Sequence, residues 1–558
     1  LKDKYPDCII LFGGHNVPND FSILVDLGFV DVLFHGESEE PFLSLLKALA
    51  LGKSLETVSN ISFRKAKGNF FRTETVYYDS VESYPSPYLL GLFDKYLTEC
   101  DPDDFCYIIE TNRGCPYHCA YCDWCFSTKL KLFPMERIKK EIEWFAVQKA
   151  EYIFCADANF GILERDLEIA QWVVDVKKRT GYPLVFNGCY AKNSDDIVFE
   201  ISKLLFDNKA NKAATLAYQS LNVIALENVN RKNFTMESFS KLLQRYNEAG
   251  IPTYTEMILG LPGETYESFC QGLCELIEAG QHGNSTVYAC QVYCNSFLGQ
   301  KDYQKKYGID VAHMPINYIR FLPPQKDEIQ EYMDLIVATN TMSREMMASA
   351  MIFCTCLQCF HHIGLLRCFA VYLRHEKNVS YLDFYHRLLD YIFSANGTLM
   401  NDVFIRLGDM CNDCTTGEWT YCDERFGDTG WFLEEGAFLE LIYDHKRFWE
   451  EIKPFLDSFE IDKDVYKELL NYQQSIIRMP NQKTLELNLS YDYYNYFLDI
   501  FTNKYEPLKK IKNKLTMEVD IGVANWKDYA KLVMLYAKRR GDTVITNAKK
   551  NVRLDYIK

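Results

Sequence analysis

Six strand-like runs alternate with helical runs between residues 105 and 312, and this alternation constrains the fold more than any other feature. The strands are predicted at residues 106–110, 152–156, 184–190, 214–218, 253–259 and 286–292. Intervening runs such as 135–147 and 236–249 carry apolar residues at helical spacing. Parallel strands joined by helices are the natural architecture for this pattern. The sequence therefore predicts an α/β fold with an open, partial parallel (β/α)6 barrel, whose chemistry lies at the carboxyl ends of the strands.

Residues 1–55 contain two further strand–helix units. The strands are predicted at 8–12 and 30–34, with helices beginning near residue 21 and at 41–51. Two strands do not make a sheet that helices cover on both faces. We therefore expect the second half of a doubly wound, Rossmann-like domain, whose first half would precede Leu1; the absence of an initial Met agrees with this. Residues 56–104 are turn-rich and are predicted to be a linker.

The pattern changes to long helical stretches rich in Tyr, Phe and Leu after residue 312. We predict a mainly α-helical domain over 313–558 that closes the barrel and shapes a substrate pocket. Its most apolar stretch, 348–373, is interrupted by polar and charged residues, which are Gln358, His361, His362 and Arg367. Such interruptions favour a buried helix over a membrane span. With no signal-peptide pattern at the start, we expect a cytoplasmic protein without a membrane partner.

Charge and cysteine content exclude some classes of protein. The chain has 61 Lys and Arg against 77 Asp and Glu, a net charge of −16, which argues against binding to a nucleic acid backbone. The basic tail from Lys504 onward could form an RNA-binding patch, but a solvated helical face is the favoured interpretation. Twenty cysteines are too sparse for a disulfide scaffold and indicate a reducing compartment with metal or redox chemistry.

Three cysteines follow the first barrel strand at the spacing C-x3-C-x2-C: Cys115, Cys119 and Cys122. Three thiolates on one short loop can hold three irons of a 4Fe–4S cluster. The fourth iron then stays open to a substrate, as in catalytic metal sites generally. Cys125 adds a second C-x2-C and leaves two alternatives open. One is a closed structural cluster with Cys125 as fourth ligand, and the other is a zinc site, although zinc usually takes two separated cysteine pairs.

With this motif the chain resembles the radical S-adenosylmethionine (SAM) enzymes, and within them the cobalamin-dependent branch, over most of residues 5–300. The resemblance implies that the three cysteines hold the cluster and that its open iron is chelated by SAM. The implied SAM-binding residues lie mostly at successive strand ends and are Tyr121, Asp157, Gln219, Ser220, Arg231, Glu256 and Gly260. Of these, Asp157 would receive the methionine ammonium and Arg231 the carboxylate. The common Gly-Gly-Glu form is absent near Asp157, where the sequence is Cys155-Ala-Asp-Ala-Asn-Phe-Gly161.

Simpler structural interpretations exist for several of these residues. Asp157 could cap the following helix together with Asn159. Gln219 and Ser220 could be a satisfied buried pair. Gly260 could belong only to a tight turn with Pro262 and Gly263. Their order along the chain, behind a cluster loop, favours the functional interpretation.

Two loops of the amino-terminal segment resemble the cobalamin-binding domain of the same branch. They are Gly13-Gly14-His15 and Gly36-Glu37-Ser38-Glu39, and the residues implied to contact cobalamin are Gly13, Gly14, Gly36 and Glu37. Glycine allows the nucleotide tail of cobalamin to approach the backbone. The Asp-x-His-x-x-Gly signature of a cobalt-ligating histidine does not occur in the chain. It would precede Leu1, so the lower cobalt ligand stays open, and His15 is not predicted to supply it.

Two other cysteine groups have weaker claims to a metal. Cys354, Cys356 and Cys359, followed by two histidines, lie in an apolar helical stretch and are predicted to be buried thiols. Cys411, Cys414 and Cys422 lie in the Gly- and Asp-rich segment 408–430. A second cluster or a zinc ion is one interpretation of that segment. A loop that covers the barrel mouth with its Trp and Tyr side chains is the other.

The resemblance implies a methyltransferase that moves a methyl group from SAM through methylcobalamin to an unactivated carbon, or phosphorus, of a small-molecule or peptide substrate. SAM would be used twice, once as methyl donor and once as source of a 5′-deoxyadenosyl radical. The cofactors would carry the hard chemistry, and an external flavodoxin- or ferredoxin-like protein would supply electrons. The alternatives are a cobalamin-dependent rearrangement or oxidation without methyl transfer, and a non-catalytic cluster- or cobalamin-binding protein.

Overall fold

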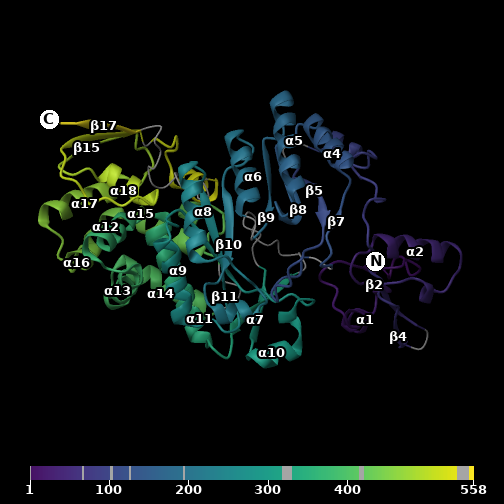
Figure 1. Cartoon of the computed structure of the whole chain (residues 1–558). Helices are drawn as coiled ribbons and strands as arrows, with labels where there is room; N and C mark the ends of the chain where they lie inside the picture. Colours follow the sequence, from purple (N-terminus) through teal and green to yellow (C-terminus); the bar gives the residue numbers. More distant parts are fainter. Residues whose placement is uncertain are drawn as a thin grey trace. The chain divides into compact units, whose positions relative to one another are not determined.

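The computed structural model describes residues 2–65, 68–100, 105–124, 127–192, 195–316, 330–413, 420–518, 520–536 and 552–557. The chain forms two compact units, and Figure 1 labels the helices and strands along the chain. The first contains residues 1–211, 228–231 and 291–308, and the second contains residues 212–227, 232–290 and 309–558. Cys125 and Cys414 fall outside the described residues.

A four-stranded sheet opens the first unit, in the order β1-β2-β3-β4 (Leu11–Phe12, Val32–Phe34, Ile61–Arg64, Phe70–Arg72). β1 and β2 are parallel, whereas β3 and β4 run antiparallel to their neighbours. The first two strands and the helices α1 (Ser22–Asp26) and α2 (Glu39–Ala50) agree with the sequence pattern. β3 and β4 lie in the range predicted as linker. Ile61 and Phe63 are buried beside β2, a tertiary contact that the turn-rich flanking sequence did not reveal.

Opposite faces of β2 pack on opposite neighbours because successive strand residues alternate in direction. Val32 and Phe34 pack with Leu45 and Ala48 of α2 in one apolar cluster. Leu33, which faces the other way, packs with Leu24 of α1 in a second cluster. Both faces of the short sheet are therefore covered without further strands. The predicted linker also contains two short helical segments, η1 (Leu55–Thr57) at its start and α3 (Asp94–Glu99) near its end.

A parallel sheet, β5-β8-β9 (Tyr107–Ile109, Tyr152–Phe160, Val185–Tyr190), forms the rest of the first unit. Its strands alternate with α4 (Met135–Val147), α5 (Glu164–Thr180) and α6 (Asp195–Asp207), whose apolar faces share one core with the sheet. β8 continues four residues beyond the predicted end, through Asn159 to Phe160. A two-stranded antiparallel ribbon, β6-β7 (Asn112–Arg113, Lys131–Leu132), follows β5, and η4 (Phe297–Gly299) and α10 (Lys301–Tyr307) complete the unit.

The second unit begins with another parallel sheet, β10-β11-β12 (Ala214–Gln219, Thr253–Leu259, Ser285–Ala289). The helices between its strands are α7 (Val223–Asn228), α8 (Met236–Glu248) and α9 (Tyr266–Glu278). Thr235 and Thr265 begin α8 and α9 by accepting a hydrogen bond from the backbone N–H three residues later, as good N-cap residues do. The predicted α/β fold with parallel strands is confirmed, and each of the six predicted strands is present.

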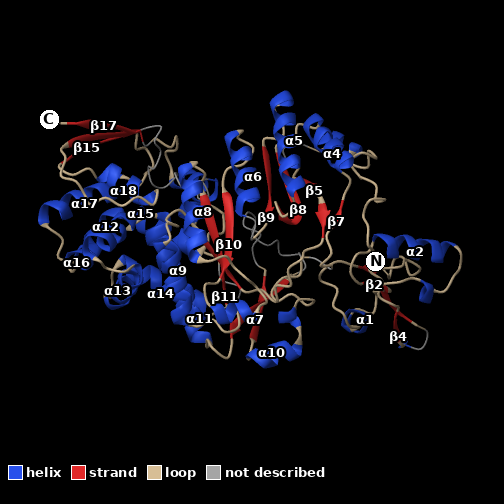
Figure 2. Cartoon of the chain, in the orientation of Figure 1, coloured by secondary structure: helices blue, strands red, loops and turns tan. Residues whose placement is uncertain are grey.

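The remainder of the second unit is largely helical, as predicted (Figure 2). Its helices are α11 (Arg344–Leu357), α12 (Arg367–Lys377), α13 (Tyr381–Ser394), α14 (Leu399–Asn412), α15 (Leu433–Tyr443), α16 (His445–Asp457), α17 (Lys463–Ser475), α18 (Tyr493–Phe501) and α19 (Trp526–Ala530), with the short segments η5 (Gln358–Ile363), η6 (Glu424–Phe426) and η7 (Lys531–Tyr536). Two antiparallel sheets accompany them, β13-β14 (Asp310–Pro315, Tyr332–Ala338) and β15-β16-β17 (Thr484–Leu489, Asn513–Glu518, Val552–Tyr556). β16 alternates buried side chains with more accessible ones, which is the strand period of two.

The apolar stretch near residue 350 is the interior of this unit. The continuous helical segment Arg344–Ile363 is long and apolar enough to cross a membrane, but 83% of its most apolar window is buried inside the protein. Cys354, Cys356 and Cys359 are buried in it, which agrees with their interpretation as structural thiols. Gly364, with φ +110°, then ends the segment before α12.

Two buried histidines join the start of β12 to these helices. His282 Nδ1 lies 3.0 Å from His361 Nε2, and His361 Nδ1 lies 2.8 Å from the Tyr385 hydroxyl. Arg367 donates to the backbone carbonyls of His361 and His362. Burial, reinforced by the charge of Arg367, holds the pKa of His282 and of His361 well below the usual range. Both rings are therefore neutral at physiological pH and act as packing and hydrogen-bonding groups.

This pair predicts that acid destabilises the second unit. In the unfolded chain both histidines protonate near pH 6.5, so below that pH the unfolded state binds more protons and the free energy of unfolding falls. At pH 5.5 each buried histidine contributes a loss of about 1.4 kcal/mol relative to pH 7.5. We expect His361→Gln to be less stable than wild type at pH 7.5 but to lose less on acidification. Urea titration followed by circular dichroism measures both effects.

The matched control is His445→Gln, because His445 is exposed. This variant should reproduce both the stability and the pH dependence of wild type. Equal pH dependence in wild type and His361→Gln would contradict the assignment of a neutral buried pair.

Candidate functional site

The ribbon β6-β7 positions the cysteine loop. Its two strands bring residues 113 and 131 side by side, so the intervening loop begins and ends at one place. Cys115 N–H donates to Ser127 O (3.0 Å), which narrows the base of the loop further. Gly114 has φ +110°, and a Cβ there would lie 2.3 Å from the Lys129 carbonyl oxygen. Only glycine fits this position, immediately before the first cysteine.

The three predicted cluster ligands lie in one turn-rich stretch of this loop. Cys122 N–H donates to Cys119 O (3.0 Å) in a tight turn, and Ala120 N–H donates to Val229 O (2.9 Å). Partial loss of water around the sulfur raises the pKa of Cys122, although the residue as a whole is exposed. Among the described residues, however, no three Cys, His, Asp or Glu side chains converge as metal ligands would. The loop thus gathers the thiols into one region without clamping them in ligand geometry.

The end of β8 supports this loop through two side chains. Asn159 Nδ2 donates to Cys115 Sγ (3.1 Å). Asp157 is fully buried and accepts hydrogen bonds from the backbone N–H groups of Thr111 (2.7 Å) and Asn112 (3.1 Å), from the Asn112 side-chain amide (2.7 Å) and from the Thr111 hydroxyl. Burial raises the pKa of Asp157 to about 7 despite these donors.

The partners of Asp157 are therefore neither of the two that the sequence suggested, the methionine ammonium of SAM and the start of the following helix. Its two oxygens are occupied by four protein donors, which leaves no free face for the ammonium of a ligand. It does not cap α5 either, since Asp166 accepts from the N–H groups of Gly161 (2.8 Å) and Leu163 (3.1 Å) there. The contacts make Asp157 a brace between β8 and the residues that lead into the cysteine loop.

Tyr121 and Arg231 are brought together in the first unit. Arg231 is 5% exposed, and its Nη1 donates to the Tyr121 hydroxyl (3.1 Å). Loss of water raises the pKa of Tyr121, so the hydroxyl stays protonated. Both residues had been predicted to contact SAM, and their mutual hydrogen bond was not foreseen.

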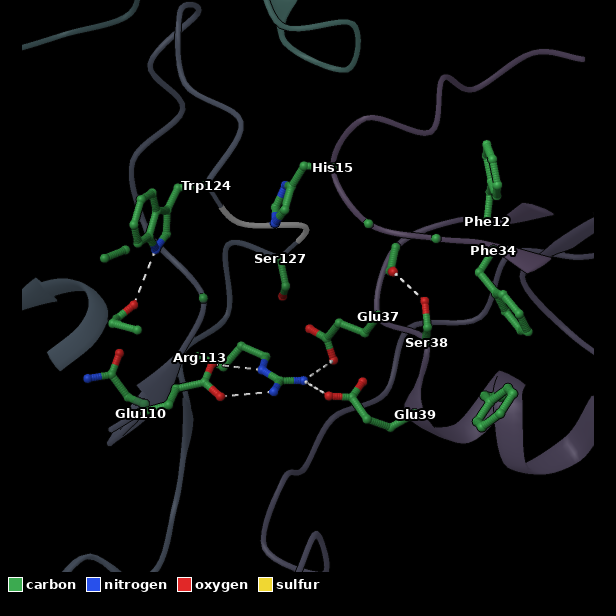
Figure 3. Close-up of a pocket in the computed structure, with 18 of the residues that line it drawn as sticks. Phe12, His15, Phe34, Glu37, Ser38, Glu39, Glu110, Arg113, Trp124 and Ser127 are labelled. Carbon is green, nitrogen blue, oxygen red and sulfur yellow. Dashed lines mark hydrogen bonds and ion pairs between the residues drawn. The ribbon is translucent and has the colours of Figure 1, made fainter. Parts of the chain in front are cut away.

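A cavity of about 630 Å³ in the first unit collects the predicted cobalamin residues (Figure 3). Gly13, Gly14, Gly36 and Glu37 all line it. Gly14 and Gly36 have φ of +98° and +77°, and a Cβ on either would meet no atom within 4 Å. One wall is apolar and contains Leu11, Phe12, Phe34 and Phe42, while the facing wall contains Trp124, Ala156 and Ala158. The cavity thus lies between the amino-terminal sheet and the residues around the cysteine loop.

Arg113 ties the two sides of this cavity together, as Figure 3 shows. Its guanidinium binds Glu110 with two hydrogen bonds of 2.9 Å and donates to Glu39 at 2.7 Å. Burial alone would lower the pKa of Arg113, but the hydrogen bonds and charges of Glu110 and Glu39 outweigh it and raise that pKa. Glu37 pairs with the buried Lys131 and lies 3.9 Å from Arg113. Sequence reasoning missed Arg113, although its place directly before the Gly-Cys pair was a usable signal.

Four predicted SAM residues lie in the second unit. Gln219 ends β10 with φ +70°, Glu256 lies within β11, and Gly260 follows β11 with φ +102°. Ser220 hydrogen-bonds to Glu264, a carboxylate that is 1% exposed and whose pKa is raised by burial. Ser220 is thus satisfied by Glu264 rather than by Gln219, and Glu264 was not singled out from the sequence. The roles of these four residues stay predictions.

The remaining cysteine group is only partly described. Cys411 is buried near the end of α14, Cys422 is exposed, and Cys414 lies outside the described residues. Tyr421 and Trp431 exchange two backbone hydrogen bonds of 2.9 and 2.8 Å, which close the loop between them. A metal at this place stays an untested alternative.

Comparison with known proteins agrees with the cysteine loop. The radical SAM superfamily model matches residues 109–271. The chain is 34% identical over 512 residues to the 2-(S-pantetheinyl)-carbapenam-3-carboxylate methyltransferase of Streptantibioticus cattleyicolor, covering 86% of this chain and 74% of that protein. It is 32% identical over 516 residues to the cobalamin-dependent radical SAM methyltransferase TokK of Streptomyces tokunonensis, covering 88% and 75%. A solved structure of the cobalamin-dependent radical enzyme OxsB with aqua-cobalamin is 14% identical, covers 85% and 72%, and has a TM-score of 0.47.

If Cys115 holds an iron–sulfur cluster, as the resemblance implies, the Asn159 contact predicts an effect on the reduction potential of that cluster. An N–H group that donates to a cluster sulfur stabilises the reduced, more negative state. We expect Asn159→Leu to retain its iron but to shift the cluster midpoint potential by about 40 mV to more negative values, the one-electron equivalent of a hydrogen bond worth about 1 kcal/mol. Redox titration monitored by electron paramagnetic resonance measures the shift.

The matched control is Asn208→Leu, because the one side-chain partner of Asn208 in the described part of the chain is local, the Leu204 carbonyl (2.8 Å). Its potential should equal that of wild type. An unchanged potential in Asn159→Leu would contradict the contact with a cluster ligand.

Proposed function

The chain belongs to the cobalamin-dependent radical SAM methyltransferases, and on that premise we propose which of its residues hold the cluster and the cobalamin. The predicted family, enzyme class and cofactors (a 4Fe–4S cluster, SAM and cobalamin) are confirmed by this membership. When bound, these groups supply an electron, a hydrogen-abstracting radical and a transferable methyl group.

Cys115, Cys119 and Cys122 are the proposed cluster ligands. The closed base of their loop, the tight turn in which Cys122 N–H donates to Cys119 O, and the N–H donor of Asn159 beside Cys115 support this assignment. Ligand sites commonly tighten only when the metal binds, which fits thiols that are gathered but not clamped. Asp157 positions the loop from below, through Thr111 and Asn112, and touches no ligand itself.

The cavity beside the two glycine loops is the proposed cobalamin site, and it is the observation that carries the proposal. Its apolar wall of Leu11, Phe12, Phe34 and Phe42 suits a large planar ring, and open space beside Gly14 and Gly36 suits close approach to the backbone. Arg113 forms ion pairs with Glu39 and Glu110. These ion pairs hold the second glycine loop, which lines the cavity, at a fixed position beside the cysteine loop. Two cofactors that must act on one substrate need such fixed spacing.

The substrate is proposed to be a small molecule that is methylated on an unactivated carbon. The named substrate of the Streptantibioticus relative, 2-(S-pantetheinyl)-carbapenam-3-carboxylate, is the first compound to test. We place the reaction in the reducing cytoplasm, with an external flavodoxin- or ferredoxin-like electron donor. The 18 described cysteines form no disulfide with one another, which suits that compartment.

Replacing the proposed ligands tests the cluster assignment. Cys115→Ala, Cys119→Ala and Cys122→Ala should each lose most of the roughly four irons of the reconstituted protein and all formation of 5′-deoxyadenosine from SAM. Cys125→Ala should keep both, because the open iron must not carry a fourth cysteine. Iron assay and chromatography of the nucleoside products are the measurements.

Cys106→Ala is the control, since Cys106 is an exposed thiol outside the loop, and it should behave as wild type. Iron retained in all three loop variants, or lost in Cys125→Ala, would overturn the assignment. Formation of 5′-deoxyadenosine without S-adenosylhomocysteine, when the carbapenam substrate is present, would argue against methyl transfer to that substrate.

Two glycines allow a matched test of the cobalamin cavity. Gly14 and Gly52 both have positive φ, +98° and +63°, and both face open space, but only Gly14 lines the cavity. An alanine at either position costs about 1 to 3 kcal/mol of backbone strain. We expect Gly14→Ala to bind aquacobalamin about tenfold more weakly because its methyl group enters the cavity, and Gly52→Ala to bind it as wild type. Equal affinities in the two variants, measured by absorbance titration, would place cobalamin elsewhere.

A further inference from the structure

One short segment of the first unit contacts both the first glycine loop and the cysteine loop. It consists of residues 293–299, which include η4, and we call it the bridge segment. The second glycine loop has its own anchors, since Lys131 pairs with Glu37 and Arg113 pairs with Glu39. The bridge segment supplies the corresponding anchor for the first glycine loop, from about 280 positions farther along the chain.

Asn295 of the bridge segment binds the first glycine loop through its side-chain amide. Its Nδ2 donates to the carbonyl oxygens of His15 (3.0 Å) and Val17 (2.8 Å). Cys294 Sγ adds a contact of 3.4 Å to the same His15 carbonyl. Val17 is 4% exposed and packs in one apolar cluster with Leu24 of α1, whereas residues 13–16 are exposed. The exposed part of the loop is therefore held by Asn295 as well as by the buried Val17.

The cysteine loop contacts the bridge segment three residues later. Leu298 N–H donates to the carbonyl oxygen of Ala120 (3.1 Å), which lies between two of the proposed cluster ligands. Leu298 and Ala120 are both fully buried. The two loops also approach each other directly, but His15 Nδ1 and Asp123 Oδ1 are 3.8 Å apart, which is beyond hydrogen-bond length. The bridge segment therefore provides a hydrogen-bonded connection between the two loops.

The bridge segment is also bonded within itself. Ser296 is 3% exposed, and its hydroxyl donates to the Tyr293 carbonyl (2.8 Å) and accepts from Gly299 N–H (3.3 Å). A Cβ at Gly299 would lie 2.4 Å from the Tyr293 carbonyl oxygen, so a larger residue does not fit. From α10, Gln304 Nε2 donates to the Leu298 carbonyl (2.8 Å). A turn bonded in this way keeps the separation between its two contact residues constant.

We propose that the bridge segment fixes the separation between the first glycine loop and the cysteine loop, with Asn295 as the positioning residue. The proposal rests on the proposed function, in which these two loops hold cobalamin and the cluster. Asn295 acts here through the backbone of His15 and Val17. Centres that must act on one substrate need a fixed spacing. Loss of the Asn295 hydrogen bonds should therefore leave each cofactor bound but let the separation between them vary.

Hydrogen exchange of the full chain, loaded with its cluster but not with cobalamin, tests the hold on the loop. Val17 N–H donates to the Gly14 carbonyl (3.2 Å), so its exchange measures opening of the loop. Asn295→Leu removes the donor at similar volume and should speed this exchange about tenfold, the equivalent of about 1.4 kcal/mol. Asn295→Asp is isosteric but its carboxylate cannot donate. It should have the same effect, and it carries the test if Asn295→Leu does not fold.

The separation of the two metal centres is measured in protein loaded with cluster and cobalamin and reduced with dithionite. The reduced cluster and cob(II)alamin are both paramagnetic, and the cluster speeds the spin relaxation of the cobalt centre to an extent that falls steeply with distance. Power saturation of the cob(II)alamin paramagnetic resonance signal should show a broader spread of relaxation rates in both Asn295 variants than in wild type. Iron content and cluster midpoint potential should equal those of wild type. A loss of stability alone would not change the spread in the folded protein.

Asn208→Leu is again the matched control. Asn208 Nδ2 also donates to a backbone carbonyl, but this is the carbonyl of Leu204 (2.8 Å) in the preceding helix α6. The variant loses a hydrogen bond of the same kind without touching either loop. It should reproduce wild type in both measurements.

Unchanged exchange of Val17 in both Asn295 variants would overturn the proposal. Faster exchange together with an unchanged spread of relaxation rates would also overturn it, since the loop would then not set the separation of the centres. Failure of wild type to bind cobalamin would count against the proposed cobalamin site. In that case the exchange measurement, which needs no cobalamin, still decides whether Asn295 holds the loop.

Discussion

The buried carboxylate of Asp157 is the contact on which the rest of the first unit's site depends. It lies near the end of β8 and accepts four hydrogen bonds from Thr111 and Asn112, the two residues that lead into the cysteine loop. A carboxylate removed from water is costly unless its oxygens are matched, and here every contact that matches them also fixes the loop. Two residues later the same strand places Asn159 against Cys115. The end of β8 therefore fixes both the position of the cysteine loop and the surroundings of the Cys115 sulfur.

Ion pairs fix the loops on the two sides of the proposed cobalamin cavity in a similar way. Arg113 reaches Glu110 on its own side and Glu39 on the other, while Lys131 holds Glu37. Half-buried ion pairs of this kind contribute modestly to stability, but their geometry is specific, above all for a guanidinium bound by two oxygens. Their value here is positional, because they join the loop beside the proposed corrin site to the loop beside the proposed cluster.

The sequence predicted the regular elements well and the contacts between them poorly. β11 begins and ends at the predicted residues, because alternation and flanking turns are local signals. β3 and β4 were missed because their assignment depends on a neighbour: Ile61 and Phe63 are buried only beside β2. The resemblance singled out Asp157 as a partner for the methionine ammonium of SAM, whereas its partners in the fold are donors of Thr111 and Asn112. Arg113 and Glu264 were overlooked because a charged residue shows its importance only through the group it faces.

By itself, the sequence determined the parallel α/β class, the cysteine spacing that is typical of a 4Fe–4S cluster and the resemblance to cobalamin-dependent methyltransferases. All of these are carried by short-range patterns that need no knowledge of folding. Only the tertiary structure decided which polar groups meet: Glu37 with Lys131, 94 residues apart, and Asp157 with Thr111, 46 apart. The physical reason is that an unpaired polar group costs free energy when it is buried. Burial is a property of the folded chain rather than of any one segment.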